Sequence, residues 1–190
     1  IRDNPNESKL FNINGACYYA IGDFDSAVDN FMHSIALKSD YAEAHFNLGG
    51  VQQDLEQNHE AILSYQRAIT IKPNYPEALN NLGGVFNELL QFSDAIESYK
   101  QALRVKPSYV EAHFALALTY QDTGQLNEAF EHFKKTTELK PNFAEAHNNL
   151  GKILISTGDF GSAINYFKNA IELLPNFYEA HNNLGTALQG

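Results

Sequence analysis

The sequence predicts an all-α protein, an α-solenoid in which antiparallel helix pairs are stacked one after another. Three features of one 34-residue period predict it: a recurring proline, a small–aromatic–small helical pattern, and a recurring Leu-Gly pair. The proline register holds Pro5, Pro73, Pro107, Pro141 and Pro175, with Ser39 in the missing place. A fixed period of this length indicates one structural unit repeated along the chain.

Aligned in rows of 34 residues, the chain divides into five full repeats and two partial ones. Residues 1–7 match the end of a preceding repeat, and residues 178–190 match the first helix of a sixth. Both ends therefore resemble cuts in a longer array. The full repeats are residues 8–41, 42–75, 76–109, 110–143 and 144–177.

The first helix of each row contains the Leu-Gly pair, as in Leu82-Gly83, with Asn14-Gly15 as a departure. Because glycine inside a helix costs about 1 kcal/mol of propensity, its recurrence predicts that two helix backbones approach closely there. We expect this helix to end at a left-handed glycine, namely Gly22, Gly124 or Gly158. Two rows carry Glu56 and Leu90 at that place, which predicts a different turn in those rows.

The second helix carries alanine, an aromatic residue and a small residue on one face, as in Ala27, Phe31 and Ser34. It ends at the proline register. A polar residue follows as the expected N-cap of the next helix, and a glutamate three residues later completes a capping box. These caps are Asp40, Asn74, Ser108, Asn142 and Asn176, with Glu43, Glu77, Glu111, Glu145 and Glu179. The capping box also accounts for a glutamate column that would otherwise suggest an acidic stripe.

The composition argues against several classes of partner. A net charge of −10 disfavours nucleic acid and anionic lipid as the main partner. No apolar run approaches the ~20 residues that a membrane span needs, and no signal peptide is evident, so a cytoplasmic location is expected. The one cysteine, Cys17, has apolar counterparts such as Val51 and Val85 in other rows, which predicts a buried structural thiol.

These columns resemble the tetratricopeptide repeat (TPR) over essentially the whole chain. The resemblance rests on the Leu-Gly pair, the alanine and aromatic columns, and the terminal proline. It implies a right-handed superhelix in which the first helices line a concave groove. TPR arrays that grip acidic chaperone tails use a basic clamp, but the corresponding columns here hold glutamate and asparagine, with only Lys9 basic.

Segments such as His147-Asn148-Asn149-Leu150 look more specifically like the repeats of O-linked GlcNAc transferases. In that subfamily an asparagine before the leucine forms a ladder that grips the backbone of a bound peptide. Ile13 and Ala115 interrupt the ladder here. Carried over by position, its rungs are Asn47, Asn81, Asn149 and Asn183.

The neighbouring groove columns are rich in amides and aromatic rings. Primary amides both donate and accept hydrogen bonds, so they suit an extended peptide backbone, and exposed aromatic residues are typical anchors. The alternative is that the asparagines keep an exposed face hydrated and that the aromatic residues are partly buried against neighbouring rows. The predicted groove residues beside the ladder are Asn12, Asn80, Asn148, Asn182, Phe46, Phe114, Leu118, Tyr19, Gln53, Asn87 and Gln121.

No catalytic constellation, cofactor motif or metal site is expected. The sequence has no phosphate-binding loop, no His-Glu-x-x-His and no nucleophile elbow. The histidine column (His45, His113, His147, His181) places its members a full repeat apart, too far for one metal ion. Its other members, Phe11 and Leu79, indicate packing.

The sequence leaves three functions open. The first is a non-enzymatic scaffold that binds a protein or peptide. The second is the substrate-recognition segment of a larger glycosyl- or sulfo-transferase whose catalytic domain lies outside this chain. The third is a scaffold that self-associates end to end, because Leu184 and Leu188 in the incomplete sixth row would be poorly covered.

Overall fold

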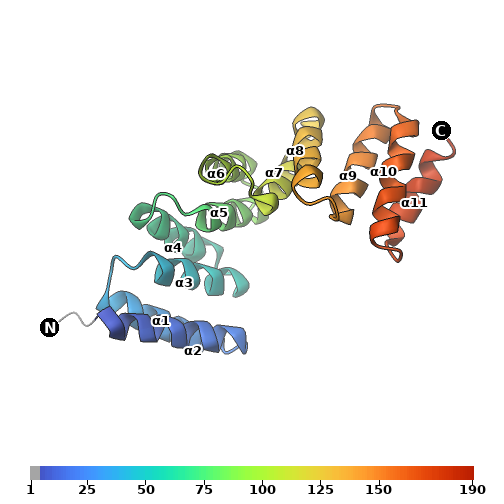
Figure 1. Ribbon diagram of the computed structural model, residues 1–190. Helices are drawn as coiled ribbons and strands as arrows, with labels where there is room; N and C mark the ends of the chain where they lie inside the picture. Colours follow the sequence, from blue (N-terminus) through green and yellow to red (C-terminus); the bar gives the residue numbers. More distant parts are fainter. Residues whose placement is uncertain (1–4) are drawn as a thin grey trace. The chain divides into compact units, whose positions relative to one another are not determined.

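The computed structural model describes residues 5–190, and these form eleven α-helices and no strand (Figure 1). The all-α prediction is confirmed. The residues 1–4 assigned to a preceding repeat lie outside the described part, whereas residues 5–7 belong to the first helix. The helices are α1 (Pro5–Ala20), α2 (Phe24–Leu37), α3 (Ala42–Asp54), α4 (Asn58–Ile71), α5 (Pro76–Glu88), α6 (Phe92–Val105), α7 (Val110–Asp122), α8 (Leu126–Leu139), α9 (Ala144–Ser156), α10 (Phe160–Leu173) and α11 (Tyr178–Ala187).

The chain forms two compact units, Ile1–Lys106 and Pro107–Gly190, which we call unit 1 and unit 2. In unit 1 the antiparallel pairs are α1 with α2, α3 with α4, and α5 with α6. In unit 2 they are α7 with α8 and α9 with α10, and α11 packs on α10.

In four of the five helix pairs, an aromatic ring of the second helix packs on a glycine of the first, and in the pair of α7 and α8 this position is Ala117. The Phe31 and Tyr65 side chains are fully buried. A Cβ atom added to Gly49 would lie 2.8 Å from Cε1 of Tyr65. The group that lies against the glycine is therefore a ring, and the prediction that two helix backbones approach each other there was wrong.

The turn between the paired helices is the same in all five full repeats. Gly22, Gly124 and Gly158 are left-handed, as expected. Glu56 and Leu90 are left-handed too, with φ of 59° and 57°, so the prediction of different turns there was wrong. Through this turn the second helix of each pair returns along the first, and Glu56 and Leu90 adopt it although the left-handed conformation costs a residue with a side chain roughly 1–2 kcal/mol.

The predicted capping boxes were also wrong. The helices begin one residue later, and none of the aromatic residues at their N-caps forms a side-chain capping bond. Packing positions this junction instead. Tyr75 is buried, and the centroid of its ring lies 5.0 Å from that of Phe46. Nζ of Lys72 lies over the Tyr75 ring, 4.1 Å from the same centroid. Two of the five glutamates form ion pairs instead, Glu43 with Lys72 at 3.5 Å and Glu179 with Lys152 at 3.1 Å.

Cys17 is exposed, so the expected buried thiol was wrong. Its counterpart Val51 is buried against Ala27 and Phe31 of the preceding helix pair. No helix precedes α1 in the described residues, and the corresponding face of α1 therefore has nothing packed on it.

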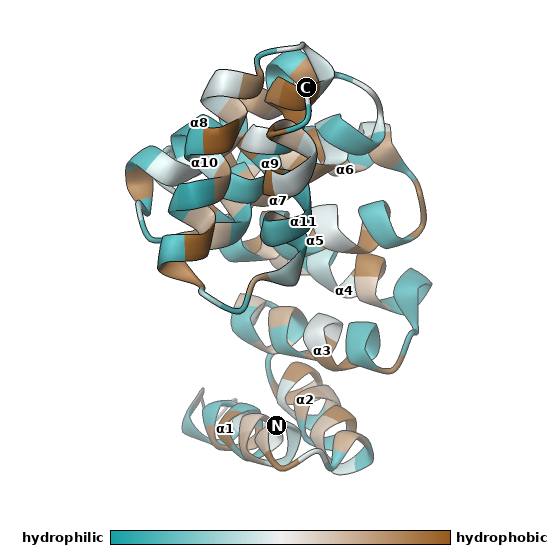
Figure 2. Ribbon diagram, turned by 90° about the vertical axis from the view of Figure 1, so that its right-hand side faces the viewer, coloured by the Kyte–Doolittle hydropathy of each residue, from teal (hydrophilic) through white to brown (hydrophobic). Residues whose placement is uncertain are grey.

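Every helix carries both polar and apolar segments (Figure 2). None of the helices within residues 5–190 is long and apolar enough to cross a membrane.

Candidate functional site

The predicted groove residues of unit 1 lie on the first helices α1, α3 and α5. We call this face the first-helix surface. All of them except Asn12 are half-buried, so each keeps some contact with solvent. The half-buried residues are Tyr19, Phe46, Asn47, Gln53, Asn80, Asn81 and Asn87.

Hydrogen bonds run from each row of this surface to the next. Nδ2 of Asn47 donates to Oδ1 of Asn12 at 3.0 Å. The Tyr19 hydroxyl donates to Oδ2 of Asp54 at 2.6 Å. Burial, together with this carboxylate, raises the pKa of Tyr19, so the hydroxyl keeps its proton and remains a donor. These bonds hold polar side chains of consecutive repeats in fixed orientations.

The Tyr65 hydroxyl joins the side chains of two first helices in a second set of hydrogen bonds. It donates to Oε1 of Gln53 at 3.1 Å and accepts from Nδ2 of Asn81 at 3.4 Å. Nε2 of Gln53 in turn donates to Oε1 of Glu88 at 2.7 Å. Burial raises the pKa of Tyr65 to about 12, which keeps the hydroxyl protonated.

Asp54 and Glu88 are acceptors on this surface that the sequence analysis missed. Each lies 35 residues after its donor, Tyr19 or Gln53. This spacing is one repeat plus one residue, and it joins equivalent turns of consecutive first helices. A search of the sequence for an acceptor 35 residues after each donor could therefore have found them.

Two glycines leave backbone uncovered between these side chains. A Cβ atom on Gly50 would have its nearest neighbours, the hydroxyls of Tyr19 and Tyr65, at 3.8 Å. A Cβ on Gly84 would have Nε2 of Gln53 at 3.9 Å. These are ordinary contact distances, so the surface has room at both positions. In unit 2 the same column carries Leu118 and Lys152.

The Phe46 ring is half-buried against its own repeat, which is the alternative to an exposed anchor. Its centroid lies 5.9 Å from that of Tyr65 and 5.0 Å from that of Tyr75. In unit 2, Phe114 is equally half-buried, at 4.6 Å from Phe143 and 5.6 Å from Phe133. Both rings therefore contribute to the packing of their own repeats.

Three predicted groove asparagines are buried. Asn148 is only 1% exposed, and its Oδ1 accepts from Nδ2 of Asn183 at 3.0 Å. This repeats the pair formed by Asn47 and Asn12, in which Asn12 is the buried acceptor. The third, Asn149, donates to the Glu145 carbonyl at 3.0 Å. The structure thus gives these asparagines a role within the scaffold.

The remaining predicted residues of unit 2 are less uniform than those of unit 1. Leu118 and Gln121 are half-buried, and Asn182 is exposed. Oε1 of Gln121 is buried and has no hydrogen-bond partner among residues 5–190. The hydrogen bonds that link polar side chains of consecutive first helices are therefore concentrated in unit 1.

The histidine column has a structural role. Nε2 of His113, His147 and His181 lies 3.0, 2.9 and 2.9 Å from the carbonyls of Pro107, Pro141 and Pro175, and Nε2 of His45 lies 3.1 Å from that of Ser39. Each imidazole thus satisfies the carbonyl at the proline register six residues before it. No group of three or more potential metal ligands occurs in the described residues.

Comparisons with known proteins agree with this architecture. The family model described as TPR repeat matches residues 53–89, 85–124 and 120–158, and the one described as tetratricopeptide repeat matches residues 144–177. The chain belongs to the TPR family. The finer resemblance to O-linked GlcNAc transferase repeats stays an expectation.

Solved TPR structures superpose on most of the chain. A crystal structure of MamA is 26% identical over 84% of this chain and 93% of its own, with a TM-score of 0.79. MamA from Desulfovibrio magneticus RS-1 is 20% identical over 90% and 97%, with a TM-score of 0.81. YrrB, described as a TPR protein with an unusual peptide-binding site, is 22% identical over 96% and 94%, with a TM-score of 0.78. The last two likenesses show the fold alone. A search of curated proteins gave no match.

Proposed function

We propose that the first-helix surface of unit 1 binds an extended segment of another protein. The observation that carries this proposal is the combination of fixed amides and uncovered backbone on α3 and α5. Asn47, Gln53 and Asn81 are held by hydrogen bonds, and Gly50 and Gly84 leave space beside them.

The chemistry of these amides fits a peptide backbone. A carboxamide has two N–H donors and two acceptor lone pairs. The bond from Asn47 to Asn12 uses one N–H, as does the bond from Asn81 to Tyr65. The positions that remain can pair with the alternating N–H and C=O groups of an extended chain. Because the side chains are already oriented, binding costs little side-chain entropy.

Hydrogen bonds alone are too weak for stable binding. Each contributes about 0.5–1.5 kcal/mol net, whereas micromolar affinity needs about 8 kcal/mol. Apolar contacts must supply the difference, and the half-buried Phe46 ring on the same helix as Asn47 is the candidate anchor. The ligand is therefore expected to carry an apolar side chain next to a stretch of extended backbone whose N–H and C=O groups are accessible to the amides.

YrrB shares this architecture and is described as having a peptide-binding site. That likeness supports a peptide as the class of ligand, while the residues proposed to hold it come from this chain. End-to-end self-association remains a separate prediction, and the exposed Leu188 is the residue on which it depends.

A displayed library of random peptides tests the proposal. Peptides selected on the wild-type protein should bind the Gly84→Leu variant at least about tenfold more weakly, because the leucine fills the space between the amides. Unit 2 carries Leu118 in this column, so the fold accommodates a leucine there. Asn81→Ala is a second variant that removes one amide.

Asn165→Ala is the matched control, because Asn165 is an exposed asparagine on the second helix α10. It should leave the affinity unchanged. Equal affinity of the selected peptides for wild type, Gly84→Leu and Asn81→Ala would refute the proposal. Circular dichroism melting of each variant ensures that folded proteins are compared.

A further inference from the structure

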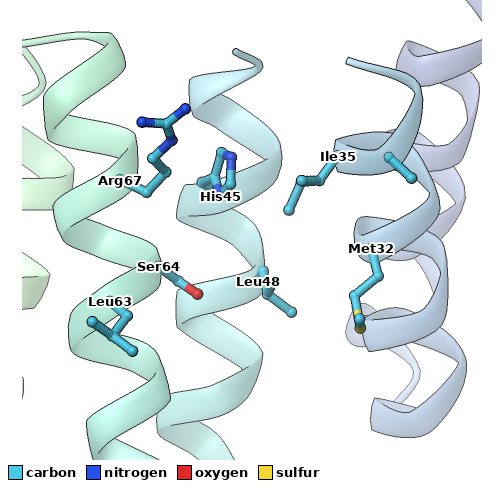
Figure 3. Close-up of a pocket in the computed structure, with 8 residues that line it drawn as sticks. Met32, Ile35, His45, Leu48, Leu63, Ser64 and Arg67 are labelled. Carbon is cyan, nitrogen blue, oxygen red and sulfur yellow. The ribbon is translucent and has the colours of Figure 1, made fainter. Parts of the chain in front are cut away.

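A second candidate site lies on the other side of unit 1, between the second helices α2 and α4. Figure 3 shows a pocket there, with α3 between the two helices and side chains from all three around it. Its volume is about 400 Å³, near the low end of the ~300–1,000 Å³ range of ligand pockets. None of its lining residues belongs to the first-helix surface.

The pocket is lined by apolar side chains that the fold leaves uncovered. Met32 is 56% exposed and Leu63 is 67% exposed. Ile35, Ala36 and the buried Leu48 form the rest of its apolar lining. Two large apolar side chains that face solvent across one pocket are candidates for a contact surface.

The repeat itself does not require these two residues to be apolar. Equivalent positions of the other rows, one repeat apart, are all polar or charged. For Met32 they are Gln66, Lys100, Lys134 and Lys168, and for Leu63 they are Asp29, Glu97, Glu131 and Asn165. Since stacking of the repeats works with polar residues there, folding does not account for Met32 and Leu63.

One end of the pocket is positively charged. Figure 3 shows the Arg67 side chain and the His45 ring together at that end. Arg67 is exposed and forms no ion pair with any carboxylate of residues 5–190, although the chain has a net charge of −10. An unpaired guanidinium beside apolar side chains is complementary to a carboxylate next to an apolar group.

His45 stays neutral at neutral pH in this setting. Burial lowers its pKa, and the charge of Arg67 lowers it further, against the effect of the bond to the Ser39 carbonyl. That carbonyl can only accept, so Nε2 of the neutral ring carries the proton. The positive charge at this end is therefore that of Arg67.

We infer that this α2–α4 pocket docks a short segment of a partner protein in which an apolar side chain stands next to an acidic one. The apolar side chain enters between Met32 and Leu63, and the carboxylate pairs with Arg67. The volume accommodates a few side chains rather than a folded surface.

Met32 provides a direct probe, because it is the one methionine in the chain. Protein labelled with ¹³C-methyl methionine gives one methyl resonance from residues 1–190. Two short acetylated peptides are titrated into it, identical except that the first carries glutamate next to two leucines and the second carries lysine there. The glutamate peptide should shift the Met32 signal and bind at least about tenfold more tightly than the lysine peptide.

Two variants assign the contacts. Leu63→Glu introduces the residue that α6 and α8 carry at this position and should abolish the shift. Arg67→Gln introduces the residue that α6 carries and should remove the preference for glutamate while a weak shift remains. Gly84→Leu, on the first-helix surface, should leave both titrations unchanged, which separates this inference from the proposed function.

Other outcomes would overturn the inference. They are an absent shift, equal affinity for both peptides, or a Leu63→Glu variant that responds like wild type. A Met32 signal that moves with protein concentration, together with a dimer in sedimentation, would assign the pocket to a second copy of the chain. A shift produced by phosphatidylglycerol vesicles and not by the glutamate peptide would assign it to a membrane.

Discussion

A Cβ atom placed on Gly83 would lie 2.7 Å from Cε1 of Tyr99. The ring is almost completely buried, so it has little room to move away. This contact joins the first helix of a repeat to the second, and the same arrangement occurs in the pairs Gly15–Phe31, Gly49–Tyr65 and Gly151–Phe167.

We therefore expect Gly83→Ala to destabilise the protein by about 1–3 kcal/mol, the usual cost of overpacking. Gly84→Ala is the matched control, because its Cβ would have no neighbour closer than 3.9 Å. That substitution should stabilise α5 by up to ~1 kcal/mol through helix propensity. Urea unfolding of both variants measures the difference. Equal free energies of unfolding would contradict the role assigned to the ring.

The left-handed Leu90 predicts a stabilising substitution. Leu90→Gly should raise the free energy of unfolding by up to ~1 kcal/mol, because glycine adopts a φ of 57° without steric cost. The reverse change, Gly124→Leu, should lower it by a similar amount, since Gly124 has a φ of 74°. Thermal melting checks both signs. A lower melting temperature for Leu90→Gly would show that its exposed side chain contributes contacts.

The buried asparagine pair of unit 2 makes a third prediction. Asn183→Ala removes the donor to Oδ1 of Asn148, which is 1% exposed. An unsatisfied buried acceptor costs about 1–3 kcal/mol. The neighbouring Asn182 is exposed, so Asn182→Ala should change stability by no more than ~0.5 kcal/mol. Chemical unfolding of the two variants distinguishes them, and similar losses would argue against a structural role for the pair.

His113 predicts a dependence of stability on pH. Burial lowers its pKa below 6.5, against the hydrogen bond to the Pro107 carbonyl. The unfolded state therefore binds a proton more readily than the folded state does, and stability falls as pH drops from about 6.5 through the folded pKa. The first repeat has phenylalanine at the equivalent position, Phe11, so His113→Phe is a substitution that the repeat accommodates. It should reduce the loss of stability at low pH. Urea midpoints between pH 7.5 and 5 measure it, and identical pH profiles would contradict the assignment.

The sequence predicted the helix pairs because their pattern repeats with the full period of the fold. It did not predict the left-handed Glu56 and Leu90, because local preference alone disfavours that conformation and the stacking of the repeats overrides it. The capping boxes failed for a related reason. Each needed only a polar residue and a glutamate, whereas packing of the buried Tyr75 and its half-buried counterparts decides where the helix begins.

The candidate site was predicted less completely. Sequence spacing predicted Asn47, Asn81 and Gln53 on one face, and the structure links Gln53 and Asn81 through the Tyr65 hydroxyl. The spacing could not show that Asn12 and Asn148 are buried acceptors, because the asparagine columns look alike until their hydrogen bonds are known. Nor did it find the α2–α4 pocket. Met32 and Leu63 are the apolar exceptions in their columns, but their sequence positions do not show that they line one pocket.

The central claim is that the fixed amides of unit 1 hold a peptide backbone. The most direct measurement follows the side-chain N–H signals of Asn47 and Asn81 by ¹⁵N NMR while a selected peptide is added. We predict that both pairs of signals shift with the same dissociation constant and that those of Asn165 do not. Unchanged Asn47 and Asn81 signals at a peptide concentration that saturates binding would contradict the claim.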